Sequence, residues 1–117
     1  MNKSLVNINV LDFSHALSGP FCSMLLAELG ANIIKIEPPG GDHFRPANGG
    51  ATFAVVNRNK RSLCVDLKQP SAPAIMERLI SKSDIVLENF TPGTMERLGY
   101  DFETLKKTKP DIIYASI

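Results

Sequence analysis

The first part of the chain predicts a strand, a helix and a second strand, which constrains the fold more than any other feature. Leu5 to Phe13 (LVNINVLDF) is rich in β-branched and aliphatic residues, as a buried strand is. Pro20 to Leu29 follows as a helix that ends before Gly30, with apolar residues at helical spacing. Asn32 to Glu37 (NIIKIE) is the second strand. Strands joined through a helix run parallel, so the sequence predicts a parallel sheet. The helical apolar residues are Phe21, Met24, Leu25 and Leu29.

The rest of the chain repeats the alternation of strands and helices. Pro38 to about Arg61 is predicted to be a loop, because Gly, Pro, Asn and charged residues replace the apolar pattern. Three helices are expected after this loop, capped by Ser71, Thr91 and Asp101. The fold class is therefore α/β, with an open, mainly parallel sheet and flanking helices. Further strands are predicted at Ser62–Leu67, Asp84–Phe90 and Asp111–Ile117.

The last predicted strand is apolar and suits an internal position in the sheet. No element follows Asp111 to Ile117 in the sequence to cover it. Domains rarely end on a buried strand, because its faces and edge need shielding. We therefore expect residues 1–117 to be the N-terminal part of a larger, truncated domain.

Composition limits the possible partners and the compartment. The net charge of +1 gives no overall basic field for nucleic acid or an anionic membrane. Cys22 and Cys64 are the only cysteines and match neither a disulfide framework nor a zinc spacing. The N-terminus lacks a signal peptide, and no apolar run approaches the ~20 residues that span a bilayer. We expect a cytoplasmic protein with no nucleic-acid or membrane partner.

Ligands of open α/β sheets gather at the carboxyl ends of the strands. Glu37 follows Gly19 at about the distance at which dinucleotide-binding folds place their ribose-binding acid. The turn HALSGP has one glycine instead of G-x-G-x-x-G, however, so NAD or FAD binding is disfavoured. The segments predicted at this edge are Ser14–Gly19, Glu37–Gly41, Leu67–Lys68 and Asn89–Gly93.

Asn89 precedes a helix start whose free N–H groups are suited to an anion. Gly93 would let a ligand approach closely, and Arg97 lies four residues later on the same helix face. Arg97 would supply a planar cation for phosphate. Spacing alone favours the simpler interpretation, a capped helix with a solvated arginine.

The remaining candidate residues have weaker signals. Three clustered cations before a strand suit phosphates but more often form a solvated loop: Arg58, Lys60 and Arg61. Cys22 lies in a first helical turn with His15 before it, yet a packed cysteine is the more typical case. His43 beside Asp42 does not make a metal site. The acids near strand ends show no catalytic pairing: Asp12, Asp66 and Glu88.

Four segments together resemble the N-terminal part of the family III CoA-transferases, also called the CaiB/BaiF family. They are VLDFSHALSGPFCSMLLAELGANIIKIEPPGGD, NRNKRSLCVDLK, DIVLENFTPGTMERLG and PDIIYASI. The resemblance covers essentially the whole chain and implies a Rossmann-like large domain, a smaller domain and an interlocked homodimer. It implies CoA transfer from an acyl-CoA to a carboxylic acid through an aspartyl-CoA intermediate. CoA is then a substrate, with no prosthetic group.

The resemblance places the nucleophilic aspartate beyond Ile117, so the chain alone is expected to be inactive. Ala16, Leu17 and Ser18 would border the thioester end and pantetheine, and Leu67 and Lys68 the nucleotide. The residues implied at the CoA phosphates or adenine are Asn89, Phe90 and Arg97.

Two departures from the formyl-CoA transferases bear on the substrate. Leu17 replaces their glutamine, and Pro38 replaces their arginine near the adenine. Both argue against oxalate or formate and leave the other transferases open. An α-methylacyl-CoA racemase and a non-catalytic CoA-binding module remain alternatives.

Overall fold

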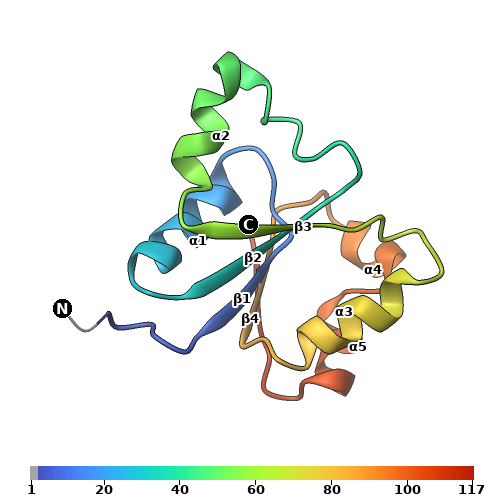
Figure 1. Ribbon diagram of the computed structural model, residues 1–117. Helices are drawn as coiled ribbons and strands as arrows, with labels where there is room; N and C mark the ends of the chain where they lie inside the picture. The colour runs from blue at the N-terminus through green and yellow to red at the C-terminus, as the bar shows by residue number, and fades with distance from the viewer. Residues whose placement is uncertain (1–2) are drawn as a thin grey trace.

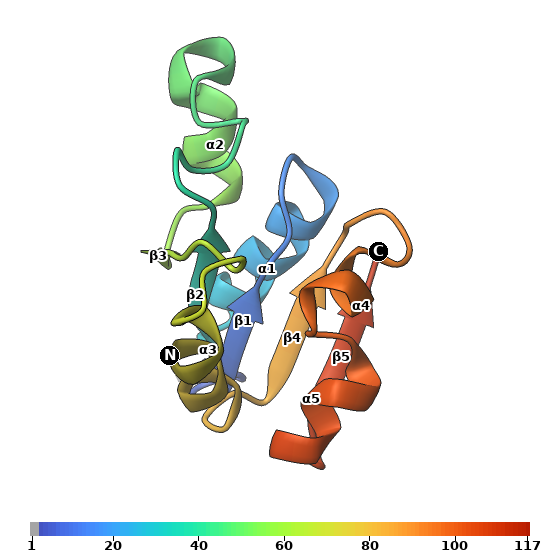
Figure 2. The ribbon, with the colours of Figure 1, turned by 90° about the vertical axis from the view of Figure 1, so that its right-hand side faces the viewer.

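A five-stranded parallel sheet forms the centre of the computed structural model, which describes residues 3–117 (Figure 1). The strand order is β3-β2-β1-β4-β5, and Figure 2 shows the strands side by side in this order. All four strand pairs are parallel, which confirms the predicted fold class. The strands are β1 (Asn9–Asp12), β2 (Asn32–Glu37), β3 (Lys60–Cys64), β4 (Ile85–Glu88) and β5 (Ile113–Ser116).

Helices cover both faces of the sheet. In Figure 1, α1 and α2 lie on one side of the sheet and α3, α4 and α5 on the other. Among residues 3–117, no helix is long and apolar enough to cross a membrane. The helices are α1 (Ser18–Glu28), α2 (Ala51–Val56), α3 (Ala72–Ile80), α4 (Thr94–Leu98) and α5 (Phe102–Thr108), with a 3-10 turn, η1 (Ala47–Gly50), before α2.

The sheet separates two apolar cores because successive side chains of a strand point to opposite faces. Val10 lies opposite Ile33 and Ile85, so these three side chains share the α1 face. They pack with Ala27 and Ala31 in the smaller core. The larger core on the other face contains Leu11, Phe13, Ile36, Val86, Met76, Ile80, Met95 and Leu105.

The predicted loop between the second and third strands contains α2, which the sequence analysis missed. The helix is six residues long, and no side chain caps it. Phe53 packs against the guanidinium of Arg45, whose Cζ lies 4.1 Å from the ring centroid. Short helices gain most of their stability from such tertiary contacts, which explains why local pattern did not reveal α2.

Most of the apolar residues that predicted α1 lie outside its buried face. Phe21, Leu25 and Leu29 are 48%, 47% and 50% exposed, and only Met24 of the four is buried. Small residues instead face the sheet, because they let the helix approach it closely. The buried residues of α1 are Gly19, Pro20, Ser23, Met24 and Ala27.

Within residues 3–117, the final strand β5 lies at one edge of the sheet. Among the described residues, β5 pairs with β4 alone. Ile113 and Ile117 are 59% and 57% exposed. The extent of the natural domain stays a prediction.

Candidate functional site

A cavity of about 340 Å³ opens at the carboxyl ends of the strands. This is the edge at which open α/β sheets bind ligands. The end of β1, the β2 strand and its following loop, the segment after β3 and the segment after β4 all contribute to it. Its walls are Phe13, Ser14, His15, Lys35, Ile36, Glu37, Pro38, Gly41, Asp42, His43, Val65, Asp66, Leu67, Lys68, Phe90 and Leu98.

The turn between β1 and α1, residues 13–18, forms one wall and is held by Asn89 from the end of β4. The His15 N–H donates to Asn89 Oδ1 at 2.9 Å, and Asn89 Nδ2 donates to the His15 carbonyl at 2.8 Å. The same Nδ2 lies 3.3 Å from Ser18 Oγ. The amide group of Asn89 therefore fixes the turn, and a direct ligand contact by Asn89 stays a prediction.

Gly19, the second residue of α1, lets the helix pack closely against this turn. A Cβ atom on Gly19 would lie 2.2 Å from the Ser14 Cβ and 2.5 Å from its Oγ. Only glycine lets the start of α1 approach Ser14 this closely. Ala16 has φ +64°, which is uncommon for a residue with a side chain. The turn is thus both tightly packed and locally strained.

Asp12 and Lys60 form a buried ion pair beneath the turn, with Nζ 3.0 Å from Oδ2. The side chain of Lys60 is 2% exposed and that of Asp12 is fully buried. Asp12 also accepts hydrogen bonds from Ser14 and Ser23, and Lys60 donates to the Pro20 carbonyl at 2.9 Å. Burial lowers the pKa of Lys60, and the carboxylate of Asp12 opposes this shift. Asp12 thus fixes the turn in this structure.

The cationic cluster of Arg58, Lys60 and Arg61, whose last two residues begin β3, does not converge on one site. Lys60 is buried in its pair with Asp12, so the expectation of a solvated loop is wrong for this residue. Arg58 pairs with Glu28 at 2.7 Å, and Arg61 donates to Asn32 at 2.8 Å. The three cations therefore have separate partners.

Both carboxylate oxygens of Glu37 are engaged within the protein. Arg45 binds them with two hydrogen bonds of 2.7 and 2.6 Å. Ser62 Oγ donates at 2.6 Å and the Asp42 N–H at 2.8 Å. Burial alone would raise the pKa of Glu37, but the hydrogen bonds from Arg45 and Ser62 outweigh it and lower the pKa to about 2. Glu37 is therefore not free to bind a ribose, which counts against the dinucleotide interpretation.

An aromatic cluster lines the cavity beside the turn. The His15 ring centroid lies 5.0 Å from that of His43 and 5.0 Å from that of Phe90. Burial is the main cause of a lowered pKa for His15, and the charge of a protonated His43 adds to it. His15 is therefore neutral at pH 7. Cys22 does not line the cavity, so the Cys-His pair gains no support.

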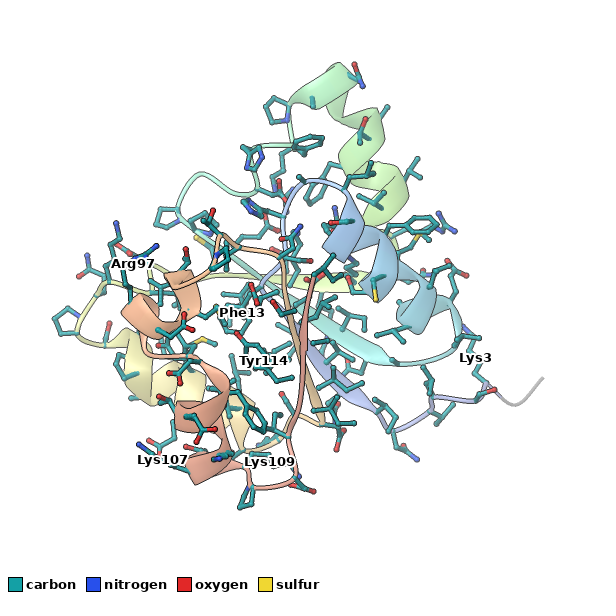
Figure 3. The ribbon with its side chains drawn as sticks, turned by 180° about the vertical axis from the view of Figure 1, so that it is seen from behind. Lys3, Phe13, Arg97, Lys107, Lys109 and Tyr114 are labelled. Atoms are coloured by element: carbon teal, nitrogen blue, oxygen red, sulfur yellow. The ribbon has the colours of Figure 1, made fainter. Side chains whose placement is uncertain are left out.

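Three of the eight site residues predicted from the sequence line the cavity, namely Leu67, Lys68 and Phe90. Ala16, Leu17 and Ser18 lie in the turn next to it, and Leu17 is 55% exposed. Arg97 is exposed and donates to Thr94 Oγ1 at 2.8 Å. Figure 3 shows Arg97 at the periphery of the molecule, away from the central Phe13.

Four polar residues of the cavity were left out of the predicted CoA site. Lys35 follows Ile33 on the α1 face of β2, and Glu37 comes next on the same face. A lysine and a glutamate at alternate positions of an apolar strand were the available signal for a buried polar layer. These residues are His15, Lys35, Asp42 and His43, and of the four only Lys35 was not considered as a candidate from the sequence.

The strand order β3-β2-β1-β4-β5 defines a Rossmann-like α/β unit, with a cavity at the carboxyl edge of its sheet. The sequence profile of the family described as "CoA-transferase family III" matches residues 5–117. The chain belongs to this family.

Curated relatives match the whole of this chain. It is 41% identical to the formyl-CoA:oxalate CoA-transferase of Bradyrhizobium diazoefficiens and covers 29% of that protein. It is 44% identical to the CoA-transferase/lyase DddD of a Marinomonas species and covers 14% of it. The chain thus spans less than a third of the length of these relatives.

Solved structures share the fold over nearly the whole chain. A crystal structure of Rv3272 from Mycobacterium tuberculosis has a TM-score of 0.94 and 42% identity, over 97% of this chain and 32% of that one. A CAIB/BAIF family protein from Brucella suis has a TM-score of 0.94 and 33% identity, over 99% of this chain and 33% of that one. The sheet and helices described here correspond to one part of those larger chains.

Proposed function

We propose that this chain forms part of the coenzyme A site of a family III CoA-transferase. The observation that carries the proposal is the meeting of Leu67, Lys68 and Phe90 in one cavity beside the turn that holds Ala16 to Ser18. These segments are distant in the sequence and were assigned to CoA by the family resemblance. The names of the relatives, among them formyl-CoA:oxalate CoA-transferase, support CoA transfer by the full-length protein.

The cavity has the composition that a CoA nucleotide requires. Apolar side chains of Phe13, Val65, Leu67, Phe90 and Leu98 provide walls for a flat adenine. Lys68 is exposed and adds a mobile cation for phosphates. The pantetheine arm would then run toward the turn, where the exposed Leu17 would border the thioester.

The proposed reaction is covalent catalysis by an aspartate that follows Ile117 in the full-length protein. Its carboxylate attacks the thioester carbonyl and releases CoA thiolate, leaving an acyl-aspartyl anhydride. The thiolate attacks the aspartyl carbonyl, which releases the donor acid and forms aspartyl-CoA. The acceptor carboxylate next attacks aspartyl-CoA, releases the CoA thiolate and forms a second mixed anhydride. The thiolate then attacks the acceptor's acyl carbonyl, which forms the new acyl-CoA and regenerates the aspartate.

Three carboxylates at or beneath the cavity of this chain are poorly suited to act as that nucleophile. Asp12 and Glu37 are buried and bonded to cations, and Asp42 lies 2.9 Å from Lys35. A carboxylate held by a cation is a weaker nucleophile than a free one. We therefore expect the 117-residue chain to bind CoA without turning over an acyl-CoA.

Leu17 and Pro38 bear on the acids that the full-length protein would use. Leu17 is exposed and apolar at the start of α1, and Pro38 is exposed at the cavity wall. Neither can donate a hydrogen bond from its side chain to a small dianion such as oxalate. We propose a larger, more apolar acyl group, and an α-methylacyl-CoA racemase remains a second candidate.

Titration calorimetry of the 117-residue chain with CoA tests the proposal, with NAD as the control ligand. Saturable binding of CoA in preference to NAD is the expected result. A folded chain that binds neither, or binds NAD better, would overturn it. Release of free thiol from an acyl-CoA by this chain would contradict the proposal that the nucleophile follows Ile117. A non-catalytic CoA-binding module predicts the same binding, and full-length protein that binds CoA without transfer would favour that alternative.

A further inference from the structure

A single buried ammonium group joins two walls of the cavity. Lys35 Nζ donates to the Ser14 carbonyl at 2.7 Å and lies 2.9 Å from Asp42 Oδ2. The side chains of Lys35 and Asp42 are 2% and 1% exposed. Ser14 belongs to the turn that precedes α1, and Asp42 belongs to the loop that follows β2. Lys35, on the strand between them, therefore fixes the separation of two segments that both line the cavity.

Each of the two segments depends on this ammonium for a different reason. The turn contains Ala16 in the left-handed region, at φ +64°, a conformation that persists only when its surroundings impose it. In the loop, Asp42 Oδ1 accepts the Phe44 N–H at 2.8 Å. Among the described residues, Asp42 Oδ2 receives no aligned hydrogen bond, so it depends on the nearby charge of Lys35 for compensation. An uncompensated buried carboxylate would draw the loop toward solvent.

We propose that Lys35 is a positioning residue that preforms the ligand cavity by holding the turn of Ser14 and the loop of Asp42 together. The consequence for CoA rests on the function proposed above. With both walls fixed in advance, the ligand does not have to order them on binding, and preorganisation of this kind increases affinity. Lys35 itself contacts no reacting atom in this role.

Two nearly isosteric substitutions separate the two contacts. Lys35→Met keeps the length of the side chain and removes both contacts. Asp42→Asn keeps Oδ1 as an acceptor for Phe44 and leaves the bond from Lys35 to Ser14. Ile80→Val, a buried change in the core on the other face of the sheet, is the matched control for mild loss of stability. Amide hydrogen exchange of the free 117-residue chain, corrected for global stability, reports each wall separately.

We expect exchange of the His15 and Phe44 amides to accelerate by about tenfold or more in Lys35→Met. In Asp42→Asn only Phe44 should accelerate, and in Ile80→Val neither should. NMR titration of the His15 ring gives a second test, in which the two variants should shift its pKa in opposite directions, because Lys35 lowers this pKa and Asp42 raises it. The pKa of His15 should therefore rise in Lys35→Met and fall in Asp42→Asn. Uniform acceleration in all three variants, or unchanged His15 exchange in Lys35→Met, would overturn the proposal.

Binding of CoA gives a separate result. If the wild-type chain binds CoA, Lys35→Met should weaken the affinity by about tenfold while Ile80→Val leaves it unchanged, in keeping with a preformed site. Equal affinity in Lys35→Met and wild type would overturn the role in preforming the cavity. If the wild-type chain binds no CoA, the proposed function fails, and the exchange and titration measurements still decide whether Lys35 holds the two walls.

Discussion

The side-chain amide of Asn89 makes hydrogen bonds to both the N–H and the carbonyl of His15, although Asn89 follows β4 and His15 follows β1. This pair of bonds joins the end of β4 to the turn after β1. Because β1 and β4 are neighbours in the sheet, the register of the strands sets where Asn89 meets the turn. Substitution of Asn89 therefore tests the turn as a structural unit.

Asn89→Ala should lower the free energy of unfolding by about 1–3 kcal/mol, because it leaves a partly buried N–H and carbonyl without their partner. Urea denaturation of the 117-residue chain measures this. Gln69→Ala is the matched control, since exposed Gln69 donates a side-chain hydrogen bond to Asp66 at 3.2 Å, and should change stability by about 0.5 kcal/mol or less. Equal effects of the two substitutions would contradict the assigned role of Asn89.

Gly19→Ala should destabilise the chain by about 1–3 kcal/mol, because the new Cβ overlaps the side chain of Ser14. The midpoint of thermal unfolding reports the change. Combining it with Ser14→Gly removes both overlapping atoms and should make the double variant more stable than the sum of the single changes predicts. Strict additivity would show that overlap with Ser14 is not the cause.

Acid stability should depend on Glu37. The pKa of this carboxyl is about 2 in the folded chain, below its ordinary value of 4.5. A depressed pKa contributes stability that is complete above the ordinary pKa and is lost as pH falls through the folded value. The free energy of unfolding should therefore fall from about pH 4.5 toward pH 2, and Glu37→Gln should flatten this part of the curve. Glu77→Gln, an exposed change on α3, is the control and should leave the slope unchanged.

Arg97→Ala should weaken CoA binding by about 1–3 kcal/mol if Arg97 turns from Thr94 to a CoA phosphate. Because the arginine is exposed and bonded to Thr94 within α4, the stability of the chain should change little. Arg78→Ala, an exposed arginine on α3, is the control for loss of one positive charge. Calorimetric affinities that do not distinguish the two variants would remove Arg97 from the proposed site.

Local sequence determined the strands, most of the helices and the edge of the sheet at which ligands meet. The strand Asn32 to Glu37 was predicted with its observed bounds, because a short apolar run between Gly and Pro is a local signal. The end of α4 at Gly99 was equally local, since a left-handed residue stops a helix. The strand pattern placed Leu67, Lys68 and Phe90 at this edge and the family resemblance assigned them to CoA; in the fold they line one cavity.

Only the tertiary structure decided which polar residues are buried and what they hold. Lys60 was expected in a solvated loop, and Lys35 was assigned no role, yet each is buried against a carboxylate from another segment. Such pairs form between residues far apart in the chain, and the cost of burying a charge is met only when the sheet brings its partner within reach. Local patterns report the hydrophobic face of an element and can mark a polar residue on it, as at Lys35, but they carry no record of its partner. The ion pairs beneath the cavity were therefore decided by the fold.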